Sequence, residues 1–212
     1  MAYIGTQPND VKKNIGLYTP SEILQLTKDG SWGGSLELIE EQSVSSVSAI
    51  NFTNIKENIY DVHLITAKDV TFTSSGNNLS LRVSNDGGST YESGSNYEFA
   101  IQWASQVAGF NEYKTTGYTQ YDIGILGGFG STMSMNFYSY MYNANDSSKF
   151  TFWSTHGTTH SSTVHHGQGM FFGGGVYDVA ETIDAFTLFG DGGDTIANAE
   201  IKLYGIKEIW AI

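Results

Sequence analysis

The stretch NLSLRVSNDGGSTYESGSNYEFA, residues 78–100, decides the fold of this chain. Apolar side chains alternate with polar ones on both sides of a central turn cluster, which is the pattern of half-buried strands. The cluster, residues 85–89, supplies the Asn, Asp and Gly residues that accept positive φ in a tight reversal. The stretch therefore predicts a β-hairpin whose core positions are Leu79, Leu81, Val83, Tyr97 and Phe99.

The same alternation continues along most of the chain after residue 35. In the first half, Leu36, Leu38 and Glu40 share one face, while Tyr60, Val62 and Leu64 alternate with Asp61, His63 and Ile65. Counting the hairpin, about ten strands are predicted, the remaining ones at residues 44–52, 121–126, 133–142, 150–154, 170–179, 185–189 and 200–210.

Many short strands with glycine turns and almost no helix predict an all-β fold, a jelly-roll-like two-sheet β-sandwich. The 25 glycines and only 2 prolines fit that class. An immunoglobulin-like module would usually be shorter, and no fixed repeat supports a propeller or a β-helix.

The chain is predicted to have two parts. Residues 1–34 hold both prolines and form a mostly irregular N-terminal arm or attachment segment, and residues 35–212 form the β-sandwich domain. A chain of this length can bury roughly two-thirds of its unfolded surface, so a self-sufficient core is expected.

One short helix is predicted inside the arm. Thr19 can cap it, Pro20 occupies the first helical position, and Glu22 lies three residues after the cap. Gly30 is the stop signal. The alternative is that residues 21–27 form an edge strand, because their apolar residues fit either period.

The charge balance is acidic, with 22 Asp and Glu against 10 Lys and Arg and a formal net charge of −12. A phosphate-binding surface needs clustered cations, so nucleic acid is not expected as a partner. The chain has no cysteine, so stability must come from packing or oligomerisation. The N-terminal residues lack the features of a Sec signal, and no apolar run is long enough for a membrane span. A soluble protein without a membrane partner is predicted.

Four of the five histidines crowd into STHGTTHSSTVHHGQG, residues 154–169: His156, His160, His165 and His166. A Ser/Thr/Gly loop does not impose the convergent geometry that a zinc or nickel site needs. We expect a solvated or oligomer-facing polar loop without a metal. The alternatives are a metal on a symmetry axis or a pH-sensitive contact.

Acidic residues also lack a site signature. Asp86, Asp191 and Asp194 lie in glycine turns whose spacing does not match an EF-hand, and turn chemistry explains them without calcium. Glu40 and Glu41 are adjacent, so on a strand they point to opposite faces and cannot form a glycosidase pair. No nucleophile elbow, P-loop or zinc-protease motif is present. We predict no catalytic residue, no metal ligand and no cofactor.

Aromatic residues are the remaining candidates for a contact surface. Tyr138, Tyr140 and Tyr142 share one face of their strand, and Phe137, Ser139 and Met141 share the other. One face must pack, and the second is a candidate contact surface. Tryptophans could stack on sugar rings or fill the core; they are Trp32, Trp103, Trp153 and Trp210.

Three phrases of the sequence carry a resemblance. LRVSNDGGSTYESGSNY at residues 81–97, AFTLFGDGGDTIANAEIKLYGIK at 185–207 and the opening MAYIGTQP resemble virion structural proteins of tailed bacteriophages, namely tail, fibre or surface β-sandwich proteins. In such proteins an N-terminal arm commonly fixes the subunit to the particle, and the sandwich is often trimeric. No catalytic or ligand residue is attached to these phrases.

The resemblance implies a non-enzymatic virion protein, tail- or fibre-associated or on the particle surface, assembled in the host cytoplasm. Its partners would be other virion proteins, further copies of itself in a trimer, and a host-surface glycan. The alternatives are a carbohydrate-binding lectin-like module, a capsid decoration protein and a polysaccharide depolymerase.

Overall fold

The computed structural model of the chain describes residues 19–28, 36–74, 78–105, 109–124, 134–160 and 168–206. The chain divides into two units, residues 1–34 and 35–212. In the first, the described residues are Thr19 and the nine-residue helix α1 (Pro20–Lys28). All described strands lie in the second, which we call the β unit.

Helix α1 begins with the predicted capping box. The Thr19 hydroxyl accepts a hydrogen bond from the Glu22 backbone N–H at 3.3 Å, and the Glu22 carboxylate accepts one from the Thr19 N–H at 2.7 Å. Two N–H groups that lack helical partners are thereby satisfied. The helix is confirmed over the edge-strand alternative, and the predicted stop at Gly30 lies outside the described residues.

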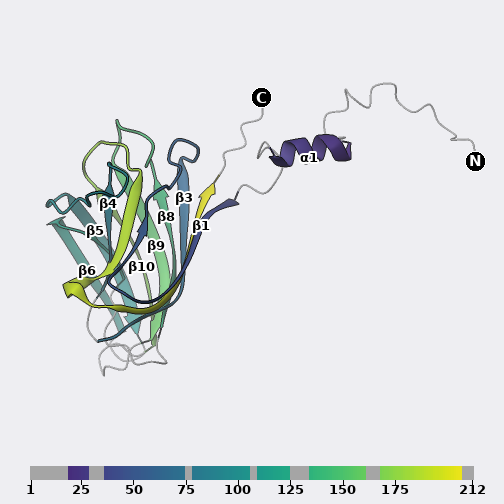
Figure 1. The fold of residues 1–212 in the computed structure, drawn as a ribbon. Helices are drawn as coiled ribbons and strands as arrows, with labels where there is room; N and C mark the ends of the chain where they lie inside the picture. The colour runs from purple at the N-terminus through teal and green to yellow at the C-terminus, as the bar shows by residue number, and fades with distance from the viewer. Residues whose placement is uncertain are drawn as a thin grey trace, which may run out of the picture. The chain divides into compact units, whose positions relative to one another are not determined.

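The strands of the described ranges form two antiparallel sheets, which Figure 1 shows as two layers. The large sheet contains, in spatial order, β1 (Leu36–Val47), β12 (Ile196–Ile206), β3 (Val62–Phe72), β8 (Met135–Tyr142), β9 (Thr151–His160), β10 (Gln168–Tyr177), β5 (Tyr97–Ser105) and β6 (Gly109–Tyr118). The small sheet contains β2 (Ala49–Phe52), β11 (Ala185–Gly190), β4 (Leu79–Ser84) and β7 (Tyr121–Gly124). The predicted all-β, two-sheet sandwich is confirmed.

The predicted hairpin at residues 78–100 is wrong. Strand β4 pairs with β11 and β7 in the small sheet, whereas β5 pairs with β10 and β6 in the large sheet. The segment that connects β4 to β5 is too long for a tight reversal. Its backbone hydrogen-bonds to β4 as a partner strand would, because the Glu92 N–H donates to the Val83 carbonyl at 2.8 Å. The Tyr97 hydroxyl accepts from the Val83 N–H at 3.0 Å, tying the two sheets together.

The chain also changes sheets at Ser48, between β1 and β2. The predicted strand at residues 44–52 is in fact the end of β1 in the large sheet followed by β2 in the small sheet. Strand β6 was not predicted, because its polar residues do not alternate with apolar ones. Such an edge strand gains its order from backbone pairing with β5 rather than from apolar burial.

The core lies between the two sheets, and the predicted core positions of β4 and β5 are buried in it. Tyr121 of the small sheet stacks on Trp153 of the large sheet with ring centroids 5.2 Å apart. Its buried hydroxyl is hydrogen-bonded to Thr155 Oγ1 at 2.8 Å. Gly175 lies against the same ring, where a Cβ atom would come within 2.7 Å of it, so only glycine fits that position.

Candidate functional site

Apolar side chains gather on the face of the large sheet that points away from the core, which we call the outer face. The strand register sets two neighbouring rows across β1, β12, β3 and β8. None of these side chains belongs to the buried core, and each is half-buried or exposed. We call this set the apolar patch: Leu36, Ile206, Val62 and Tyr142 in one row, and Leu38, Tyr204, Leu64 and Tyr140 in the next.

Strand β3 explains why the patch exists, because it is apolar on both faces. The inward positions are His63, Ile65 and Ala67, all buried. Val62 and Leu64 therefore point outward and are half-buried. The sequence pattern did not show which of the two faces of β3 would be buried. In the structure, the face that contains His63 packs in the core.

The three tyrosines of β8 share one face, as the sequence predicted, and the structure shows that it is the outer face. Tyr138 and Tyr140 meet edge to face with ring centroids 6.0 Å apart, and Tyr140 stacks on Tyr142 at 6.2 Å. The opposite face of β8, with Phe137, Ser139 and Met141, is buried in the core. The tyrosine face is thus the one left for contact.

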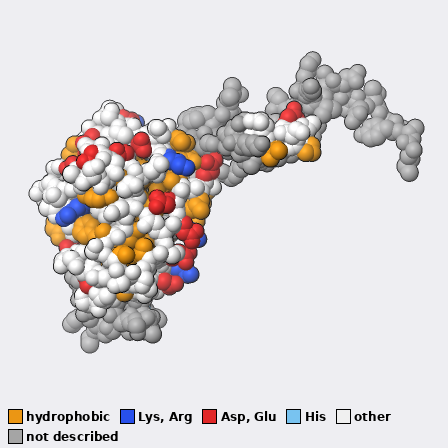
Figure 2. Space-filling view, viewed as in Figure 1, with side chains coloured by type: hydrophobic (Ala, Val, Ile, Leu, Met, Phe, Trp, Pro, Cys, Tyr) orange, Lys and Arg blue, Asp and Glu red, His pale blue; other side chains and the backbone are white. Residues whose placement is uncertain are grey.

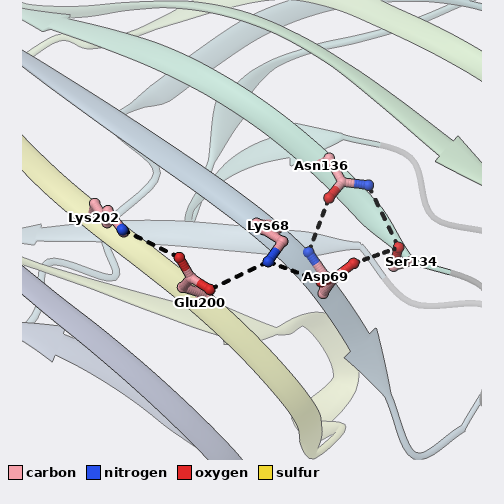
Figure 3. Close-up of polar contacts among 6 residues, drawn as sticks. All are labelled: Lys68, Asp69, Ser134, Asn136, Glu200 and Lys202. Atoms are coloured by element: carbon pink, nitrogen blue, oxygen red, sulfur yellow. Dashed lines mark hydrogen bonds and ion pairs between the residues drawn. The ribbon is translucent and has the colours of Figure 1, made fainter.

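A chain of charged and polar side chains, shown in Figure 3, begins at Lys202, which lies two residues along β12 from Tyr204 of the apolar patch. Glu200 of β12 lies 3.3 Å from the Lys202 ammonium and 3.5 Å from that of Lys68 on β3. Asp69 has positive φ at a bulge, and its N–H donates to Asn136 Oδ1 of β8 at 2.9 Å. Hydrogen bonding to Lys202, together with the charge of Lys68, lowers the pKa of Glu200. An apolar centre with a polar rim is the usual anatomy of a protein interface.

A groove lies on the same face over β10, β5 and β6. It consists of two neighbouring hollows of about 590 and 260 Å³ that share Ala100 and Lys114. Phe152 lines the larger hollow and Phe172 the smaller one. Their side chains are 45% and 40% exposed, so both rings are available to a ligand.

The tryptophans do not form this surface. Trp153 is buried in the core, and Trp103 packs against the core and is half-buried. Trp32 and Trp210 lie outside the described residues. Exposed aromatic surface is instead supplied by Phe and Tyr side chains.

The predicted histidine loop is partly wrong. His156 and His160 belong to strand β9, and His165 and His166 lie outside the described residues. Inward Thr and Gly residues alternate with these outward histidines, so the stretch follows the strand period that its composition obscured. His156 Nδ1 is 3.2 Å from the Tyr138 hydroxyl, which joins it to the tyrosine face.

The carboxylates of the glycine turns accept hydrogen bonds, from neighbouring residues at Asp86 and from distant parts of the chain at Asp191 and Asp194. Asp86 accepts from the Thr90 N–H and hydroxyl and from the Ser84 hydroxyl, which lowers its pKa to about 2. Asp194 accepts from Ser74 Oγ at 2.6 Å. Asp191, on the short 3-10 turn η1 (Asp191–Gly193), accepts from Gln120 Nε2 at 3.0 Å.

Glu40 and Glu41 diverge, as the sequence predicted. Glu40 accepts a hydrogen bond from the Gln42 side chain, whereas Glu41 lies 3.5 Å from Lys202 on the outer face. The two carboxylates therefore do not act as a pair.

The outer face of the small sheet carries a polar network instead of an apolar patch. Asp122 is fully buried and accepts hydrogen bonds from Ser80 Oγ at 2.6 Å and Gln120 Nε2 at 3.2 Å. Burial raises the pKa of Asp122, and these hydrogen bonds oppose the shift. Arg82 closes the network by donating to Gln120 Oε1 at 3.1 Å while lying over the Phe189 ring.

Across the described ranges, no group of three or more His, Asp or Glu side chains is placed to hold a metal ion. The helix in the described part of the chain is not long and apolar enough to cross a membrane. On the side seen in Figure 2, Lys and Arg side chains are scattered among Asp and Glu rather than gathered in a basic patch. Comparison with known protein families, curated proteins and solved structures finds no match.

Proposed function

We propose that this chain is a non-enzymatic structural protein of a tailed-phage particle that works through protein contacts made by the outer face of the large sheet. The apolar patch is the observation that carries the contact role. The place in a virion rests on the three sequence phrases that resemble phage tail, fibre and surface proteins.

The patch has the size of the largest apolar patch on a typical monomer, which is often a functional surface. Strand spacing and side-chain repeat give its two rows a flat area on the order of 300 Å². Leu36 and Leu38 are 46% and 53% exposed. Apolar patches of this size, rimmed by polar residues, commonly mark interaction sites. Covering the patch would remove this apolar surface from water, which favours association.

Further copies of the same chain are the partner that the charges favour. A net charge of −12 opposes self-association through most of the surface. The patch itself holds no charged side chain, and its rim offers both signs in Lys68, Lys202 and Glu200. A stable interface buries about 800 Å² per partner, so the patch would be its centre and the rim would complete it.

We propose a homo-oligomer on this basis, with the trimer of the resembling proteins as the favoured state. A patch that packs on its own equivalent gives a dimer, whereas a trimer needs the patch of each copy to contact a different surface of the next. The mass in solution therefore also identifies the type of interface.

Light scattering of the purified protein tests the contact role. Leu64→Glu places a charge in the centre of the patch and should convert the oligomer to a monomer at micromolar concentration. Thr158→Glu is the matched control, because Thr158 is exposed on the same face outside the patch. A wild-type monomer, or an L64E oligomer, contradicts the proposal.

Mass spectrometry of purified particles tests the location. The protein should copurify with virions in tens to hundreds of copies, where a low number indicates a tail and a high number a decoration protein. Its presence in infected-cell lysate and absence from particles would contradict the virion role.

A further inference from the structure

We propose that the groove between Phe152 and Phe172 binds a short neutral oligosaccharide. This is a ligand-binding activity in addition to the assembly role, and it does not depend on that role. It stands on the shape of the groove, the two aromatic rings that flank it, and the polar side chains at its rim.

The floor of the groove lacks side chains that could fill it. Ala100 of β5 pairs with Gly174 of β10, and both lie in the row between the two phenylalanines. A Cβ atom on Gly174 would lie 2.5 Å from the Trp153 carbonyl oxygen, so the packing of β10 against β9 requires glycine there. The hollow is therefore a built feature of the sheet. A concave surface of this kind suits a small ligand better than it suits a flat protein partner.

Two exposed rings stand at opposite ends of this floor. Phe152 pairs with Val176, which is four residues along β10 from Phe172. At the rise of a strand this separation is about 13 Å, a span that a short oligosaccharide can bridge. The C–H faces of pyranose rings are apolar and stack on aromatic side chains, while the sugar hydroxyls remain free for hydrogen bonds.

The rim supplies both donors and acceptors for hydroxyl groups. Lys114 projects between the two hollows and is held by Glu112, with an Nζ to Oε1 distance of 2.8 Å. Glu98 and Thr116 line the larger hollow, and Gln102 lines the smaller one. One cation faces two carboxylates here, so the local charge is slightly negative. A polyanionic ligand is disfavoured and a neutral sugar is favoured.

The groove adjoins the apolar patch at one end only. Phe152 is the register partner of Tyr142 on β8, whereas Ser154 and His156 of β9 stand between Tyr140 and Tyr138 and the rest of the groove. A ligand on Phe172 and the floor can therefore bind without displacing the contact proposed for the patch. Changes at Phe172 and Ala100 should leave the oligomeric state unaltered, and light scattering of F152A checks whether that ring also contributes to the contact.

A glycan array followed by titration calorimetry with the best neutral oligosaccharide tests the proposal. Phe172→Ala and Phe152→Ala should each weaken binding roughly tenfold or more, because each removes one stacking platform. Phe110→Ala is the matched control: Phe110 is 81% exposed on the same sheet but outside the groove, and its loss should leave binding unchanged. Equal affinities for F172A and F110A would overturn the proposal.

A second pair of variants fills the hollow without removing a ring. Ala100→Leu should abolish binding by occupying the floor, and Ala104→Leu, four residues further along β5, should not. Thermal unfolding and light scattering of both variants confirm that fold and assembly are intact. Binding retained in A100L overturns the proposal, as does a folded wild type that binds no neutral glycan on the array or at millimolar concentration.

The class of sugar has its own test. Lys114→Met should reduce affinity for a neutral glycan only modestly, because the lysine contributes one hydrogen-bonding group among several. Binding confined to sialylated or uronic-acid glycans and lost in K114M would overturn the neutral class.

Discussion

The outer faces of the two sheets differ in the side chains that they carry and in how far these are exposed to water. On the small sheet, Ser80, Asp122 and Thr187 point away from the core, yet all are buried and hydrogen-bonded to neighbouring side chains. On the large sheet, Leu38 and Phe152 point away from the core and remain about half exposed. On the small sheet, these polar side chains find their hydrogen-bond partners within the chain. On the large sheet, apolar side chains remain exposed and are available to another molecule. The contacts that stabilise the fold and the contacts that we propose with other molecules thus lie on different faces.

The largest effect on stability should come from disrupting the buried hydrogen-bond network on the small sheet. Asp122→Ala leaves the buried Ser80 hydroxyl without its acceptor and removes one of the acceptors of Gln120 Nε2, so the free energy of unfolding should fall by about 1–3 kcal/mol. Thr158→Ala, on the exposed face of the large sheet, is the control and should change it by less than about 0.5 kcal/mol. Chemical denaturation measures both values. Equal stability of the two variants would show that the network on the small sheet is not closed.

Arg82 should matter next, because its guanidinium seals the same network. It donates to the Thr119 carbonyl at 3.0 Å, and its Cζ lies 4.8 Å from the centroid of the Phe189 ring. Arg82→Met keeps the stem but loses these interactions, and should cost about 1–2 kcal/mol of unfolding free energy. Lys114→Met, on the open face, should leave the unfolding free energy unchanged. A loss in K114M that equals the loss in R82M would erase the contrast between the faces.

The pH dependence of stability should have opposite signs in the two sheets. Burial lowers the pKa of His63 in the large sheet below 6.5, opposed by its hydrogen bond to the Ile55 carbonyl and by the charge of Asp61. The unfolded state then binds more protons, so this contribution is present above pH 6.5 and is lost as the pH falls below it. His63→Gln should flatten the slope between pH 5 and 7 in thermal unfolding.

Asp122 provides the opposite case. Because its folded-state pKa is raised, the folded state binds the proton more tightly above pH 3.8, and its contribution to stability decreases as the pH rises through that window. The difference in unfolding free energy between wild type and D122A should therefore decrease with rising pH, whereas the difference between wild type and H63Q should increase. Parallel slopes would contradict the two burial effects.

The smallest effect is expected at the charged rim of the apolar patch. Glu200→Gln breaks ion pairs to Lys68 and Lys202 that are exposed to water and screened by salt. Thermal unfolding in 0.15 M salt should show no measurable change, while light scattering should show weaker association. A clear drop in melting temperature would mean that the rim stabilises the fold rather than the contact.

Much of the core was predictable because alternation indicates burial whichever sheet a strand joins. Leu79, Leu81, Tyr97 and Phe99 are buried as predicted, although β4 and β5 lie in different sheets. The hairpin prediction failed because strand pairing is set by partners far along the chain. The Thr19 capping box was predictable because its contacts are local.

The sequence predicted only those parts of the candidate site whose residues all belong to one strand. Tyr138, Tyr140 and Tyr142 share a face by their spacing alone. The groove needs Phe152, Gly174 and Ala100 from three strands, and their register is not visible in a single sequence. One usable signal was the glycine run at residues 173–175, since glycine inside a strand marks a close approach of backbone or ligand.

The pairing of β1 with β12 affects the order in which the protein can fold. Leu36 and Ile206 are register partners, so β1 lies beside a strand at the other end of the β unit (Figure 1). Within the large sheet, β1 pairs with β12 alone among the described strands. During synthesis β1 emerges early and has no sheet partner until β12 leaves the ribosome. Such long-range closure slows folding and leaves an exposed edge on the nascent chain, so chaperone dependence should be greatest before β12 is made.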